Sequence, residues 1–232
     1  MSVRGEVRDA EEGRRPASRA AEDYLKAIYR LERPSSPVST SDLADVLERA
    51  APSVTNMIKG LATRGLVEHA PYHGVRLTPR GREAALRILR RHRVLESYLI
   101  EKLGYAWDGV HAEAERLEHA ASDALIDRMD EALGRPDHDP HGSPIPAEDG
   151  KMERTALRPL LEVPRDQPFV VGEVADQDPN RLRDAGAVGL FPGARVTVTG
   201  PGRDEGSLEI VVDGHRHTVG RNVAAAVAVR RV

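Results

Sequence analysis

The stretch GVHAEAERLEHAASDAL, residues 109–125, places carboxylate and imidazole side chains where an amphipathic helix normally carries its apolar face. In a helix over roughly residues 109–133, four potential metal ligands fall at i, i+4, i+7 and i+8 on one face: His111, Glu115, Glu118 and His119. Such a face resists burial unless a cation neutralises it. The spacing therefore predicts a metal-binding face, and a solvent-exposed face is the alternative.

Two further segments supply residues of the same chemistry. His92 and Glu96 are spaced i, i+4 on the preceding predicted helix, and Glu22 and Asp23 lie near the start of the first one. The chain has no cysteine, so any metal must be held by imidazole, carboxylate, Met, carbonyl or water. Three helices that each offer such groups can converge on one cation.

Sequence motifs of hydrolytic enzymes are absent. The zinc-peptidase pattern H-E-x-x-H, the nucleophile motif G-x-S-x-G and the P-loop do not occur. We therefore predict that the chain is not an enzyme, and a metal-dependent hydrolase is the weaker hypothesis.

The first third of the chain has the element order of a winged helix-turn-helix. Apolar spacing, helix caps and helix-breaking residues predict three helices, at residues 19–32, 39–49 and 51–64. Two short strands around the turn PYHG follow at residues 66–78, and a fourth helix follows at 79–103. Pro52 suits the first turn of the third helix, and Gly65 suits its end. In a winged helix this third helix enters the major groove of DNA.

The third predicted helix presents small polar and basic groups that can reach phosphates and base edges: Ser53, Thr55, Asn56 and Lys59. The net charge is −3, but residues 53–93 carry nine Lys or Arg against two Glu, whereas residues 101–149 carry thirteen acidic residues against four basic ones. This distribution predicts that one region binds an anionic polymer and the other binds cations. Two solvated surfaces of opposite sign are the alternative.

The C-terminal part changes in composition. Residues 134–165 are dense in Pro, Gly and Asp and indicate an extended segment and linker. Residues 168–232 alternate apolar and polar positions in five runs, which predicts a small β-barrel of about five strands. The longest apolar run, VAAAVAV, is too short to span a membrane, and the charged N-terminus is not a signal peptide. We therefore expect a cytoplasmic protein without membrane contact.

These motifs together resemble the diphtheria-toxin-repressor family of metal-dependent bacterial transcription regulators. The resemblance is carried by AEDYLKAIYRLE, APSVTNMIKGLATRGLV, GVRLTPRGREAAL, RRHRVLESYL, VHAEAERLEHAASDAL and DPHGSPIP, and it extends more loosely into the β-rich tail. It implies a mainly α protein with a β-rich C-terminal domain. The implied parts are a disordered tail (1–17), a winged helix (18–84), a helical metal-binding and dimerisation domain (85–150), a linker (151–167) and an SH3-like barrel (168–232).

The resemblance also implies which residues bind metal and DNA. A primary metal site would use Asp23, Glu115, Glu118 and His119, with His92 nearby. An ancillary site would use His92, Glu96 and His111, helped by a barrel side chain such as Glu173, Asp176 or Asp178. In the recognition helix, Ser53 and Thr55 would contact phosphates and Pro52 and Asn56 would reach base edges; Lys59 and, in the wing, Arg76 complete the expected DNA-binding set.

Two positions indicate the metal. The iron-responsive branch of the family has Met and Cys among its primary ligands, whereas the matching positions here are Asp23 and Glu115. Hard oxygen donors suit Mn²⁺, so the chain looks more like the manganese-responsive branch, with Fe²⁺ as the alternative. Lys26 stands where the short manganese regulators have a Glu, and those regulators lack the barrel.

The resemblance thus implies a repressor of metal-uptake genes that binds a palindromic operator on double-stranded DNA as a homodimer, with metal as co-repressor that orders the winged helix against the dimer core. The alternative is a winged-helix regulator that senses an organic ligand, with the His/Glu face purely structural.

Overall fold

The computed structural model describes residues 18–32, 36–70, 74–152, 155–175 and 178–232. The chain forms two compact units, one up to Leu89 and one from Arg90 onward. The expected tail (1–17), most of the PYHG turn (71–73) and Asp176 lie outside the described residues. In the part of the chain that the structure describes, no helix is both long and apolar enough for a membrane span.

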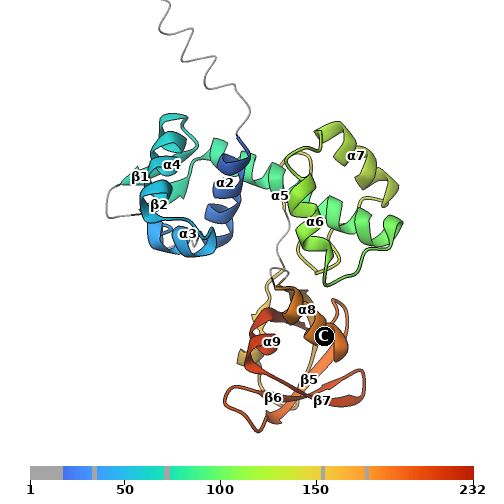
Figure 1. Cartoon of the computed structure of the whole chain (residues 1–232). Coiled ribbons are helices and arrows are strands. Elements are labelled where there is room, and N and C mark those ends of the chain that lie inside the picture. Colours follow the sequence, from blue (N-terminus) through green and yellow to red (C-terminus); the bar gives the residue numbers. More distant parts are fainter. Residues whose placement is uncertain (1–17, 33–35, 71–73, 153–154, 176–177) are drawn as a thin grey trace, which may run out of the picture. The chain divides into compact units, whose positions relative to one another are not determined.

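The first unit has the predicted order of helices and strands (Figure 1). It contains α2 (Arg19–Leu31), α3 (Thr40–Val46), α4 (Ala51–Thr63), β1 (Val67–Ala70) and β2 (Gly74–Leu77). The Ser18 and Ser39 side chains cap α2 and α3 by accepting backbone hydrogen bonds. The two strands pair antiparallel as a wing. The predicted winged helix-turn-helix is confirmed.

One apolar core holds these elements together. Leu25 and Ile28 of α2, Leu43 of α3 and Ile58 of α4 are fully buried, and Val75 of β2 closes the core from the wing. Because Val54, Ile58 and Leu61 of α4 point into this core, the polar face of the helix is left outside.

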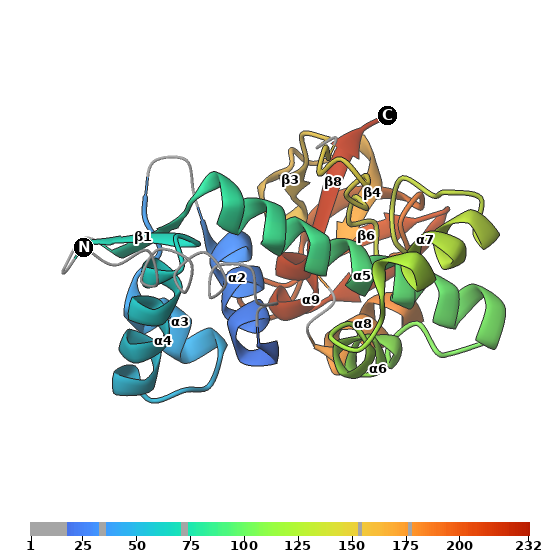
Figure 2. The same cartoon turned by 90° about the horizontal axis from the view of Figure 1, so that it is seen from above.

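The second unit contains the C-terminal half of α5 (Pro79–Leu103), then α6 (Val110–Leu117) and α7 (Asp123–Ala132). Figures 1 and 2 show α6 and α7 beside this half of α5. Val94 and Leu95 of α5 pack there in one core with Ala114 and Ile126.

The prediction of a single helix over residues 109–133 is wrong. α6 ends at Leu117, Glu118 is its C-cap, and a turn follows before α7. The Ser122 side chain accepts a hydrogen bond from the Leu125 N–H and so starts a new helix. A serine that caps a helix competes with the continuation of the preceding one.

The C-terminal part of the second unit is a six-stranded antiparallel sheet in the order β3-β8-β4-β5-β6-β7. Its strands are β3 (Arg158–Pro159), β4 (Pro168–Val174), β5 (Arg195–Pro201), β6 (Leu208–Val212), β7 (His215–Val219) and β8 (Val227–Arg231). The five predicted strands correspond to β4 to β8.

Three features of this domain were not predicted. Helices α8 (Pro179–Ala187) and α9 (Arg221–Ala226) flank the strands, and β3 pairs with β8 inside the stretch expected to be linker. The short 3₁₀ helix η1 (Leu160–Glu162) follows β3 and buries Leu160 in the barrel core. These segments are too short to show a helical or strand period in sequence.

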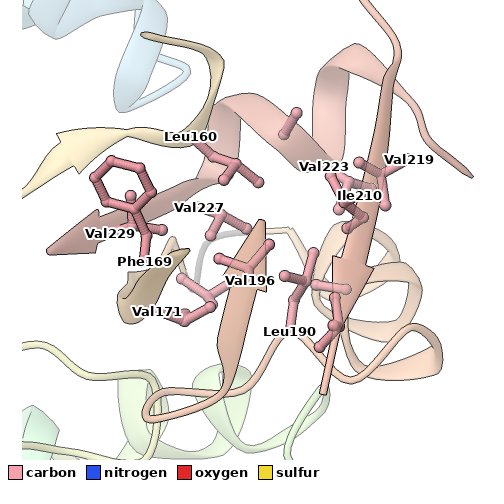
Figure 3. Close-up of a cluster of buried hydrophobic side chains, with 14 of the residues drawn as sticks. Leu160, Phe169, Val171, Leu190, Val196, Ile210, Val219, Val223, Val227 and Val229 are labelled. Atoms are coloured by element: carbon pink, nitrogen blue, oxygen red, sulfur yellow. The ribbon is translucent and has the colours of Figure 1, made fainter. Parts of the chain in front are cut away.

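The barrel encloses a core of aliphatic and aromatic side chains (Figure 3). Phe169 and Val171 of β4, Val196 of β5 and Val227 of β8 point toward one another there. The alternation of buried and exposed positions along β5 is the period-two pattern expected of a strand with one buried face.

Replacing Phe169 by Ala should lower the free energy of unfolding by about 3–5 kcal/mol, since it removes a ring that is 1% exposed and leaves a cavity. The other phenylalanine, Phe191, is 43% exposed, so Phe191→Ala should cost clearly less. Chemical denaturation followed by circular dichroism compares the two variants. Equal losses would contradict the placement of Phe169 in the core.

Candidate metal centre and DNA-contacting helix

Helix α5 turns two polar side chains into the interior of the second unit. His92 and Glu96 are one turn apart and both are 0% exposed. Burial of such groups is costly unless partners or a cation compensate them. Their partners therefore decide what the site can do.

Three nitrogen and oxygen atoms form a nearly equilateral triangle. His92 Nε2, Glu96 Oε1 and His111 Nδ1 are each 3.0 Å from the other two. In octahedral coordination with bonds of about 2.1 Å, neighbouring ligand atoms lie about 3.0 Å apart. The second carboxylate oxygen of Glu96 is buried and has no hydrogen-bond partner among the residues that the structure describes. These three residues therefore fit one face of a divalent cation.

Glu115, Glu118 and His119 lie around this triangle. Glu115 Oε1 is 3.6 Å from His111 Nε2, and His92, His111 and Glu115 each offer a ligand atom within 4.8 Å of the others. Glu118 is fully buried; it accepts a hydrogen bond from His92 Nδ1 at 2.6 Å and lies 3.3 Å from His119 Nε2. The structure thus brings together the expected ligands of the second unit. Asp23 lies on α2, in the first unit.

The expected barrel ligands have different environments. The Glu173 carboxylate accepts a hydrogen bond from the Ser143 hydroxyl at 2.6 Å. Asp178 caps α8, where its side chain accepts from the Asn180 and Arg181 N–H groups. Asp178 is therefore occupied by a structural task, which leaves Glu173 as the candidate among the described residues.

The carboxylates strongly perturb the imidazoles. Burial by itself would lower the pKa of His92, but the charges and hydrogen bonds of Glu96 and Glu118 raise it to about 9. Burial would raise the pKa of Glu96, but His92 and the neighbouring histidines hold it well below its usual value. The metal-free cluster therefore holds a protonated His92 between two carboxylates.

Sequence reasoning missed His141. It is 0% exposed; its Nε2–H donates to the Trp107 carbonyl at 2.9 Å, and its Nδ1 lies 3.9 Å from Glu96 Oε2. Burial would lower the pKa of His141, but Glu96 and the Trp107 carbonyl raise it to about 9. The only signal in sequence was its position in the motif DPHGSPIP, which has no helical or strand period.

Helix α4 presents the polar face that was expected to contact DNA. Pro52, Ser53, Asn56 and Lys59 are exposed, while Thr55 is half-buried and its hydroxyl donates to the Ala51 carbonyl at 3.0 Å. On the wing, Arg76 lies opposite Glu68 in the β1–β2 pair.

The buried Tyr24 side chain of α2 supports the start of this helix. Its hydroxyl lies within hydrogen-bonding reach of the Ser53 side chain, and burial raises the pKa of Tyr24. The first turn of α4 is thereby held against α2.

Comparison with known proteins accounts for the whole arrangement. The N-terminal DNA binding domain of iron dependent repressors matches residues 17–75, their metal binding and dimerisation domain matches 78–147, and the FeoA domain matches 158–231. The iron-dependent repressor IdeR of Mycobacterium tuberculosis is 34% identical over 229 residues, which cover 91% of this chain and 96% of IdeR. The diphtheria toxin repressor of Corynebacterium efficiens is 27% identical over 222 residues, which cover 91% and 95% of the two chains.

Solved structures agree. A manganese-dependent transcriptional repressor in complex with manganese is similar with a TM-score of 0.84 and 39% identity, over 91% of this chain and all of that one. IdeR of T. acidophilum is similar with a TM-score of 0.75 and 28% identity, over 94% of this chain and all of that one. ScaR with bound Zn²⁺ is similar with a TM-score of 0.78 and 28% identity, over 91% of this chain and 99% of that one.

These relatives are transcriptional repressors, not enzymes, and their likeness extends over 91% of this chain. The chain belongs to the iron-dependent repressor family: it is a metal-dependent transcriptional repressor that binds DNA, dimerises through its helical domain and carries an SH3-like FeoA domain at its C-terminal end.

Proposed function

We propose that this repressor responds to Mn²⁺ in preference to Fe²⁺. The triangle of His92, Glu96 and His111 suits an octahedral divalent cation, and its hard oxygen and imidazole donors carry the preference for Mn²⁺. The remaining candidate ligands are carboxylates and an imidazole, and the chain has no cysteine to favour a softer metal. The manganese complex of a similar repressor is consistent with this choice.

The chain has two metal sites in this proposal. A primary site uses Asp23, Glu115, Glu118 and His119, and an ancillary site uses His92, Glu96 and His111. Barrel groups complete the ancillary site, with Glu173 and Asp176 as candidates. The hydrogen bond between Glu118 and His92 supports a link between the two sites, because one carboxylate serves both neighbourhoods.

Metal dependence follows from where the primary ligands lie in the chain. Asp23 belongs to the winged-helix unit, whereas Glu115, Glu118 and His119 belong to the other. A bound divalent cation supplies the positive charge that lets these carboxylates converge. The side chains therefore favour the ordered arrangement of the two units only when they share the cation, which is a shift of a conformational population.

DNA recognition is assigned to the polar face of α4 and to the wing. Ser53 and Thr55 contact phosphates, Pro52 and Asn56 reach base edges, and Lys59, together with Arg76 of the wing, adds positive charge. A homodimer places two such helices about 34 Å apart, which matches a palindromic operator. We assign this role to the domain of residues 18–84, the metal sites and dimer to 85–150, and the barrel to 168–232 after a linker.

The dimer surface is assigned to the apolar residues that α6 and α7 leave exposed. Leu117 and Leu125 are 37% and 44% exposed, and Ala121 lies between them in the chain. A second copy of the chain packed on this side would cover these exposed apolar side chains. The target genes in this proposal are those of metal uptake, regulated in the cytoplasm.

Changing Glu118 or His119 to Ala should abolish Mn²⁺-dependent operator binding and leave a folded dimer, because each change removes a primary ligand. Gel-shift titration with Mn²⁺, alongside size-exclusion chromatography, measures both properties. A variant that still responds to Mn²⁺ like the wild type would refute the assignment of the primary site.

Substitutions in the recognition helix should affect DNA binding in two different ways. Asn56→Ala should lower the preference for the correct base pair at one position by about 1–3 kcal/mol. Lys59→Ala should lower the affinity for operator and random DNA alike, and it should reduce the slope of log affinity against log salt concentration by about 1. Binding measured on both DNAs at several salt concentrations separates these effects. Equal loss on the two DNAs for both variants would contradict the assignment.

The pKa of His92 predicts opposite pH trends for stability and for metal binding. Because it is raised from 6.5 to about 9 in the folded state, its stabilising contribution is fully present below pH 6.5 and is lost as the pH approaches 9. Metal-free protein should therefore melt at lower temperature as the pH rises across this range, while Mn²⁺ affinity increases because less proton displacement is needed.

Anaerobic calorimetric titration and thermal melts at matched pH values test these trends. The exposed barrel residue His215 serves as the control, and His215→Gln should reproduce both wild-type trends. Mn²⁺ affinity that stays flat between pH 6.5 and 9 would contradict the protonated state of His92.

A further inference from the structure

The turn of residues 139–143 lies between the metal-site residues of α5 and strand β4 of the barrel. We propose that His141 is a positioning residue: its side chain faces Glu96 and holds that carboxylate in the orientation of a metal ligand. Its backbone carbonyl accepts a hydrogen bond from β4, so His141 also couples the docking of the barrel to metal affinity. This inference rests on the proposed ancillary site, but it assigns a role to a residue outside the ligand sets.

The imidazole of His141 restricts the second oxygen of Glu96. Its Nε2–H is committed to the Trp107 carbonyl at 2.9 Å, so the ring orientation is set, and its Nδ1 faces Glu96 Oε2 at 3.9 Å. Both facing atoms are buried, and neither has a hydrogen-bond partner in the described part of the chain. The His141 ring therefore occupies the space on the Oε2 side of the carboxylate. Glu96 Oε1 therefore stays directed at His92 and His111.

The turn that carries His141 is anchored to the helix that carries Glu96. The Asp139 carboxylate accepts hydrogen bonds from the His141 and Ser143 N–H groups at 2.9 and 3.0 Å, and Arg93 Nε of α5 lies 3.6 Å from its other oxygen. The Arg93 guanidinium also donates to the Pro144 carbonyl. His141 consequently keeps a defined position relative to α5.

The other side of the same turn contacts the barrel backbone directly. The Val174 N–H of β4 donates to the His141 carbonyl at 2.9 Å, beside a bulge between Val171 and Glu173. Gly142 has φ +90°, and a Cβ there would lie 2.0 Å from the Gly172 carbonyl oxygen. A side chain at residue 142 would therefore push the turn away from β4.

The fluorescence of the single tryptophan, Trp107, should report on the contact between the turn of residues 139–143 and the barrel. Trp107 lies with its ring 5.1 Å from His141 and 4.9 Å from Phe191 of the barrel, and its indole N–H donates to the Pro140 carbonyl at 3.0 Å. Because coupling between two sites is reciprocal, loss of the contact between the barrel and this turn should weaken metal binding at Glu96. The same loss should change the fluorescence emission of Trp107.

Two conservative variants of the full chain test the role of the imidazole. In His141→Asn the amide nitrogen can occupy the place of Nδ1 beside Glu96, whereas in His141→Gln it occupies the place of Nε2 and keeps only the Trp107 bond. Calorimetric titration with Mn²⁺ should show about a tenfold loss of affinity at one class of site for Gln and substantial rescue by Asn. Wild-type affinity in both variants, or equal losses that track a lowered melting temperature, would overturn the proposal.

A second pair of variants tests the coupling to the barrel. Gly142→Ala introduces the clash with Gly172, whereas Gly134→Ala is the matched control, because Gly134 has φ +81° but open space around its Cβ position. Gly142→Ala should shift Trp107 emission to longer wavelength and weaken Mn²⁺ binding at the same class of site, and the control should do neither. A shifted emission with unchanged Mn²⁺ affinity would refute the coupling.

Mn²⁺ binding separates a failure of the proposed metal sites from a failure of the role of His141. If chelator-stripped wild-type protein binds no Mn²⁺ at all, the proposed metal sites are wrong. If the wild type binds Mn²⁺ and His141→Gln binds it equally well, only the positioning role of His141 is wrong.

Discussion

The contact between His92 and the two carboxylates that flank it governs the helical half of the second unit. Glu96 and Glu118 are both fully buried, and each needs the imidazole or a cation to offset its desolvation. Glu118 is the C-cap of α6 and keeps helical backbone angles, and its side chain reaches His92 Nδ1 at 2.6 Å. The break between α6 and α7 comes directly after this buried carboxylate.

The donor set explains why a repressor of this family can work without cysteine. Oxygen and imidazole ligands suit the harder divalent cations, and selectivity among them depends on geometry more than on softness. The raised pKa of His92 adds a proton that any cation must displace. Metal affinity is consequently set by the buried charge balance as well as by the ligands.

Patterns with a clear period were predictable from sequence. The apolar spacing of α2 and α4, the Ser39 cap and the alternation along β4 to β8 each express one local physical rule. The i, i+4 pair of His92 and Glu96 was found in the same way. The break after Leu117 and the role of Asp178 as a helix cap were not predicted, because competition between capping and helix continuation decided them. The elements α8, α9 and β3 were not predicted either, because they are short and β3 pairs with the distant strand β8.

The sequence by itself determined the residue chemistry of this protein: hard metal ligands, a polar recognition helix and a β-rich C-terminal domain, since composition and periodicity are local properties of the chain. Only the tertiary structure decided which of those ligand atoms meet at 3.0 Å, and that His141 lies against Glu96. His141 is 45 residues from Glu96 in the chain, and no periodic pattern connects them. Contacts at that separation arise from packing, in which the turn of 139–143 fits between α5 and the bulge of β4.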